Sequence, residues 1–140
     1  LIFSKWVTFL TKTIGLPERW QIIQRLISTV EFYYPGSSTH IASDWGQLIN
    51  RTAFFNFTSA DQIDGSTLNR TVTIHDLPDD SGLSYCRNHL VNNTPTPFFF
   101  LMDDDFTIEE DSHIDILLEF LYRYPHIDII AGKIPEDIVA

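Results

Sequence analysis

The chain has 140 residues, of which 44% are hydrophobic and 20% are charged, and its formal net charge is −10. This is the composition of one globular domain, or part of one, with enough apolar residues to form a core. The acidic balance excludes a nucleic-acid backbone as partner, because that partner needs a basic face, whereas an anionic nucleotide can still bind through a divalent cation.

The first part of the chain has the pattern of a βαβ unit. Trp6–Lys12 is β-branched and aromatic and predicts a buried strand, and apolar residues at helical spacing predict a helix over 18–33. Ser38–Ala42 predicts a second strand, which indicates parallel pairing with the first. Asp44 follows it directly. An acid there can accept from a sugar hydroxyl or a base N–H, or it can cap the next helix, and position alone favours capping.

The middle of the chain is less regular. Gln47–Arg70 has no clear period and predicts an irregular connection. Three of the four N-x-[S/T] sequons of the chain fall between Asn50 and Thr71, which favours a lumenal or extracellular setting. Residues 71–74 then predict a short strand, and 75–82 a polar turn.

A helix is predicted over Leu83–Val91. Cys86 within it is the only cysteine, so no internal disulfide can form. His75 has no histidine or cysteine partner at ligand spacing, and no zinc site is predicted.

An apolar run ending in three carboxylates is the feature around which the chain is organised. Phe98–Met102 predicts a strand buried on both faces, and Asp103, Asp104 and Asp105 follow with no spacer. Interior carboxylates are costly unless a cation or strong donors meet them, so we expect them where the strand leaves the core. Ligands bind at that edge of open α/β sheets, and hard oxygen ligands suit Mg²⁺ or Mn²⁺. The alternative is a polar turn of solvated acids.

The remaining pattern completes an α/β alternation. An apolar stripe through Ile114 and Leu121 predicts a helix, and Ile127–Gly132 predicts another strand. No apolar run reaches the length of a membrane span and no signal peptide is recognisable. Because the sequence begins at Leu1 rather than Met, we expect a fragment of a longer protein, with any membrane anchor outside it.

The ordered blocks Thr8–Thr13, Gly82–Asn88, Asp103–Phe106 and Tyr124–Gly132 together resemble the GT-A glycosyltransferases. The nearest likeness is to the β-1,4-N-acetylgalactosaminyltransferases that build gangliosides and related glycans. The resemblance implies that residues 1–140 are the nucleotide-sugar-binding part of a single GT-A domain. That domain would be a Rossmann-like, mostly parallel sheet flanked by helices, here incomplete.

The resemblance also implies a site and an activity. Asp103 and Asp105 would hold Mn²⁺ or Mg²⁺, with the metal mainly on Asp105 and with Asp103 and Asp104 near the ribose and diphosphate of a UDP-sugar. Three further residues would line the nucleotide pocket: Thr11, Asp44 and Arg87. The implied reaction is inverting, metal-dependent transfer of a sugar from the UDP-sugar to a glycan or glycolipid acceptor, and the best guess for the sugar is N-acetylgalactosamine. The implied location is the Golgi lumen or the secretory pathway. No catalytic base is named.

The chain departs from that family after the second predicted strand. The family usually has two adjacent acids there, and here Ser43 stands at the first and Trp45 where a small residue is common. Three alternatives therefore stay open: a GT-A transferase for another UDP-sugar, a non-catalytic glycan- or partner-binding domain of the same fold, and an acidic domain that takes Ca²⁺. The last is disfavoured because the D-x-[DN]-x-[DN]-G pattern is absent. The acceptor and the oligomeric state are not indicated.

Overall fold

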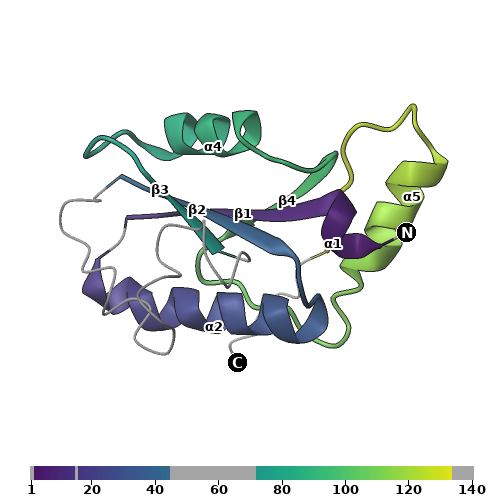
Figure 1. Cartoon of the computed structure of the whole chain (residues 1–140), viewed down its shortest axis with the longest axis horizontal. Coiled ribbons are helices and arrows are strands. Elements are labelled where there is room, and N and C mark those ends of the chain that lie inside the picture. The colour runs from purple at the N-terminus through teal and green to yellow at the C-terminus, as the bar shows by residue number, and fades with distance from the viewer. Residues whose placement is uncertain (1, 15, 45–71, 134–140) are drawn as a thin grey trace, which may run out of the picture.

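A computed structural model describes residues 2–14, 16–44 and 72–133 of the chain (Figure 1). Within these ranges the elements are α1 (Phe3–Trp6), β1 (Val7–Thr13), α2 (Pro17–Tyr33), β2 (Ser38–Ser43), β3 (Val72–Asp76), α4 (Leu83–Asn92), β4 (Phe98–Asp103) and α5 (Ile114–Arg123). The irregular connection expected over 47–70 lies outside the described residues. Across those described, no helix combines the length and apolar character needed to cross a bilayer.

The strands form one parallel sheet in the order β3-β2-β1-β4. The predicted α/β class is confirmed: the sheet is flanked by helices as an incomplete, Rossmann-like α/β domain. β1 lies inside the sheet and is almost wholly buried, and its residue Thr8 pairs with Ser38 on one side and Phe99 on the other. The predicted parallel pairing of the first two strands is therefore correct.

Helices cover both faces of the sheet, with α2 on one and α4 on the other (Figure 1). Alternation along each strand sends successive side chains to opposite faces, which produces two apolar clusters. The cluster beneath α2 is the larger and contains Phe9, Ile23, Leu26, Ile27, Val30, Ile41, Val72, Met102, Ile108 and Ile114. The cluster beneath α4 contains Leu10, Ala42, Leu77, Cys86 and Leu90. The helix α4 therefore rests on few apolar contacts.

Two predictions about the second half of the chain are wrong. Phe98–Met102 forms β4 but is not buried on both faces: Phe99 is 45% exposed and Leu101 is 38% exposed. The reason is that β4 lies at an edge of the described sheet, while α4 packs over β1 and β2. Ile127–Gly132 is not a strand, and Ile129 is 86% exposed there, because the segment pairs with no strand among the described residues.

The boundary predicted between strand and turn near His75 also shifts. β3 runs through Asp76, so His75 belongs to a strand rather than to the turn that follows. The ladder explains the extension, because Ala42 and Ser43 of β2 supply partners for His75 and Asp76.

The start of α5 is completed by a side chain from another element. Its N-cap residue, His113, has a left-handed backbone (φ 46°) and no capping side chain. The Tyr34 hydroxyl accepts instead from the Ile114 N–H at 2.9 Å. Tyr34 also stacks on Phe3, and burial raises the pKa of its phenol. This contact ties α5 to the end of α2, because it satisfies a helix N–H that would otherwise lack a partner.

Replacing Tyr34 with Phe should therefore lower the free energy of unfolding by about 1 kcal/mol, which is typical of a lost helix cap or buried hydrogen bond. Urea denaturation measures the change, and Tyr33→Phe is the matched control because Tyr33 is a more exposed neighbour on the same helix. Equal destabilisation by the two variants would contradict the capping role.

Candidate functional site

The carboxyl ends of β1, β2 and β4 meet at one edge of the sheet, and the predicted polar residues gather there. Lys12 of β1 pairs in register with Asp103 of β4, and Asp44 follows β2 directly. The connection from β1 passes through α2 on one face, and that into β4 passes through α4 on the other. β1 and β4 are therefore the strands at which the winding reverses, and ligands of open α/β sheets bind at this point.

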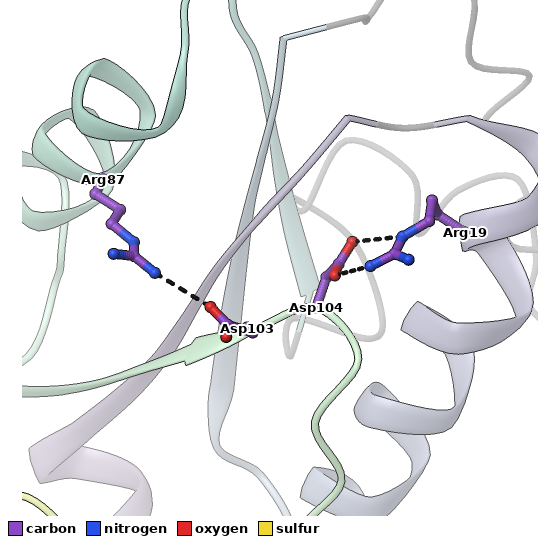
Figure 2. A network of polar contacts seen from close by, with 4 residues as sticks. All are labelled: Arg19, Arg87, Asp103 and Asp104. Carbon is purple, nitrogen blue, oxygen red and sulfur yellow. Dashed lines mark hydrogen bonds and ion pairs between the residues drawn. The ribbon is translucent and has the colours of Figure 1, made fainter.

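The three aspartates form a tight turn at this edge. The Phe106 N–H donates to the Asp103 carbonyl at 3.2 Å, so Asp104 and Asp105 are the two central residues of a β-turn. The acids do not form one cluster: Asp103 points toward α4, Asp104 points toward α2, and Asp105 is exposed in the turn (Figure 2). The turn thus separates the charges that the sequence places side by side.

Asp104 is held by an arginine that the sequence analysis did not identify. Arg19, in the first turn of α2, donates from Nε to Asp104 Oδ2 at 3.0 Å and from Nη2 to Oδ1 (Figure 2). Asp104 is only 8% exposed, and this paired hydrogen bonding keeps its charge satisfied. The same contact raises the pKa of the Arg19 guanidinium.

The signal for Arg19 was present in the sequence. A cation in the first turn of a helix is opposed by the helix dipole, so Arg19 needs an anionic partner at the same edge of the sheet. Its distance from Asp104 along the chain, 85 residues, hid that partner.

Arg87 and Asp103, both predicted, are brought together from different elements. Arg87 Nη2 on α4 lies 3.2 Å from Asp103 Oδ1, and the Asp103 side chain is 60% exposed (Figure 2). An exposed pair of this kind contributes little to stability, so either partner can exchange it for a ligand at small cost. Arg87 and Asp103 thus lie side by side at the carboxyl edge of the sheet.

Asp44 is engaged within the protein. It is buried, its Oδ2 accepts from the Gly82 N–H at 3.1 Å, and its Oδ1 forms an ion pair with Lys12 Nζ at 3.2 Å without hydrogen-bond geometry. Gly82 is the N-cap residue of α4, so Asp44 stabilises the start of that helix. The two residues are 38 positions apart in the sequence. Asp44 is at the predicted edge, but a nucleotide would have to share or displace these contacts.

Thr11 is near the site but not open to it. It lies on β1 one register position before the Asp103 pair, beside Met102, and it is fully buried. Its hydroxyl has no hydrogen-bond partner among the described residues. The side chain therefore reaches the interior of the sheet rather than its carboxyl edge.

Two carboxylates of the turn are exposed and have few contacts with other described residues. Asp105 is exposed and makes no hydrogen bond or ion pair with another described residue, and Asp103 has only the exposed contact with Arg87. Within residues 2–14, 16–44 and 72–133, no group of three or more His, Cys, Asp or Glu side chains is arranged to hold a metal. Two carboxylates fit Mg²⁺ or Mn²⁺, which commonly take their other ligands from water and substrate phosphates.

Comparison with protein-family models and with curated proteins gives no match. What this edge can do is therefore inferred from its own residues. They comprise the exposed carboxylates of Asp103 and Asp105, the Arg87 guanidinium beside Asp103, and a turn held from α2 by Arg19.

The Arg19 contact generates a test of the turn. Arg19→Gln should lower the free energy of unfolding by about 1–3 kcal/mol, because it leaves the buried Asp104 carboxylate without its partner. Arg25→Gln, an exposed arginine on the same helix, is the control and should cost much less.

Adding Asp104→Asn to Arg19→Gln should recover part of the loss, since it removes the unpaired charge. A double-mutant cycle measured by urea denaturation gives the coupling between the two side chains. A coupling near zero would show that the pair does not hold the turn.

Proposed function

We propose that this chain is the nucleotide-binding part of a metal-dependent GT-A-type glycosyltransferase that moves a sugar from a UDP-sugar to a glycan or glycolipid. The observation that carries the proposal is the acidic turn at the β1/β4 edge, with Arg87 beside it. The turn supplies cation ligands at the place where nucleotides bind open α/β sheets. The best guess for the donor sugar, N-acetylgalactosamine, rests only on the resemblance of the sequence blocks.

Each residue has a role set by its position. Asp105 would hold Mn²⁺ or Mg²⁺ with Asp103, and Asp103 would also lie near the ribose. Arg87 would exchange the Asp103 carboxylate for the diphosphate, for which its planar, two-pronged guanidinium is well suited. Asp104 would fix the turn rather than contact the donor, because Arg19 already occupies both of its oxygens.

Charge explains why a cation is needed. The chain carries a formal charge of −10, so a nucleotide diphosphate meets an unfavourable field unless positive groups lie at the site. A bound divalent cation would offset the negative charge that develops on the departing diphosphate. Arg87 would add positive charge from the α4 side. The acceptor hydroxyl would be activated by a carboxylate that the proposal does not assign.

A second candidate is a non-catalytic domain of the same fold that binds a glycan or a partner enzyme. The observation that favours it is Asp44, whose contacts with Lys12 and Gly82 leave it poorly available to a nucleotide base. Donor profiling separates the UDP-sugars within the first proposal, and transfer assays on the full-length protein separate the two proposals.

UDP should bind at least about tenfold more tightly when Mn²⁺ is present, because two carboxylates alone make a weak metal site that phosphate oxygens complete. Isothermal titration of this chain with UDP, with and without Mn²⁺, measures the difference. Asp105→Asn should remove it. Asp111→Asn changes an exposed acid outside the turn and should leave it intact.

UDP affinity that is the same with and without Mn²⁺ in the folded chain would refute the metal role. Metal-dependent UDP binding without sugar transfer by the full-length protein would support the binding-domain candidate instead.

A further inference from the structure

Three histidines from three elements form a continuous hydrogen-bonded chain away from the acidic turn. His75 Nε2 on β3 lies 3.0 Å from His40 Nδ1 on β2, and His89 Nε2 on α4 lies 3.1 Å from His75 Nδ1. The ring centroids are 5.0 Å apart in both pairs. His40 is 8% exposed, and the other two rings are half-buried. The central ring therefore uses both of its nitrogens within the protein.

The number of protons on this chain is limited by its geometry. A neutral imidazole has one N–H and one acceptor nitrogen, so three neutral rings satisfy both contacts with all N–H groups pointing the same way along the chain. One added proton is also accommodated, for example on His75, which then donates to both neighbours. A second added proton makes two N–H groups face each other in at least one contact. Two added protons therefore break at least one of the two hydrogen bonds between the histidines.

The contact that can open is the one between His75 and His89. His40 and His75 lie on adjacent strands that are joined by a backbone ladder, whereas His89 belongs to a helix. Only Cys86 and Leu90 of the ten residues of α4 are buried. Polar contacts thus make an unusually large contribution to holding this helix on the sheet.

The charged side chains near the three histidines pair with one another or are directed away from the rings. Apart from the three histidines, the titratable and charged side chains on or next to the surrounding described elements are Lys12, Asp44, Asp76, the exposed Tyr85, Cys86 and Arg87. Lys12 pairs with Asp44, and Arg87 pairs with Asp103. Asp76 follows His75 on the strand, so strand alternation directs its side chain to the opposite face of the sheet. The Asp44 carboxylate is engaged with Lys12 and the Gly82 N–H rather than with the three rings.

We propose that the His40–His75–His89 chain is an acid-sensitive latch that holds α4 on the sheet at neutral pH and releases it when a second proton binds. Release would withdraw Arg87, which lies on the same helix, from Asp103 at the carboxyl edge. The latch would thereby couple pH to the candidate site. It depends on α4 and the sheet, not on which nucleotide or sugar the site takes.

The direction and range of the pH dependence follow from the ring environments. Burial, and then the charge of His75, lower the pKa of His40 to about 4, and burial and His89 lower the pKa of His75. Departure of α4 removes both causes of the lowered pKa of His75, which then returns toward its ordinary value of 6.5, so His75 binds a proton more tightly in the released state. The latch is therefore intact above pH 6.5 and is lost progressively as pH falls toward 4.

Cys86 provides a direct measure of release. It is the only cysteine of the chain, and it is a fully buried residue of α4 that packs in the cluster between this helix and the sheet. Burial also raises the pKa of its thiol, so labelling rates must be divided by those of a free thiol at each pH. With 4,4′-dithiodipyridine, the corrected rate should rise as pH falls below 6.5, approaching about tenfold per pH unit if release takes up one proton. Sub-denaturing urea should not change it, because release of one helix exposes little surface.

Two variants separate the latch from other causes. His89→Gln keeps a hydrogen-bonding side chain but removes the titratable ring, and its corrected rate should vary little with pH. His126→Gln changes an exposed histidine after α5 and should behave as the original chain does. A pH-independent rate in the original chain, or the same pH dependence in His89→Gln, would overturn the proposal.

If His89→Gln does not fold, ring nitrogen NMR of the original chain decides. At pH 7.5 the proposal requires that the N–H groups of both histidine contacts point in the same direction along the chain. On acidification, the ring nitrogen chemical shifts that report these two hydrogen bonds should be lost together. Independent titration of the three rings would contradict it. So would a metal site in the same place, shown by Zn²⁺ slowing Cys86 labelling at pH 7.5.

Discussion

The buried contact between Arg19 and Asp104 is the constraint on which the candidate site depends. Consecutive carboxylates repel one another, and a strand end offers few ways to separate them. By taking Asp104 down toward α2, Arg19 fixes the turn in which Asp103 points toward α4 and Asp105 stays exposed. Each partner offsets the cost of the other. Arg19 near a helix N-terminus would be unfavourable without an anion, and Asp104 near the core would be unfavourable without a cation.

The same edge shows why α4 is held differently from α2. The helix α2 buries a broad apolar stripe and stays on the sheet for that reason. The helix α4 buries few apolar residues, and it makes polar contacts at three points: with Asp44 at its start, through Arg87 in its middle and through His89 near its end. Each of these points involves a charged or titratable group. The side of the site that α4 forms is therefore sensitive to charge in a way that the α2 side is not.

Much of this fold could be predicted from periodicity, and the exceptions have physical causes. The βαβ unit and the acidic strand end are local patterns. The strand predicted over Trp6–Lys12 and the helix predicted over 18–33 lie within one residue of β1 and α2, and the aspartates lie at the C-terminal end of β4 as expected. The exposure of Phe99 could not be predicted from periodicity, because it depends on which strands α4 covers. Arg19 and the histidine chain were missed because their partners are distant in sequence. His40, His75 and His89 show no ligand spacing, and only the sheet register brings two of them together.

The long sequence separations within this edge have a consequence for how the protein forms. The Thr8–Thr96 contact spans 88 residues and Arg19–Asp104 spans 85, so the central strand cannot complete its pairing until most of the chain has been synthesised and collapsed. Closing such loops is entropically expensive, and folds dominated by distant pairings are slow to form. The acidic turn is built on the last of these pairings. Until β4 joins β1, Asp103 to Asp105 form only a run of negative charge, so the candidate site arises with the completed sheet and not before it.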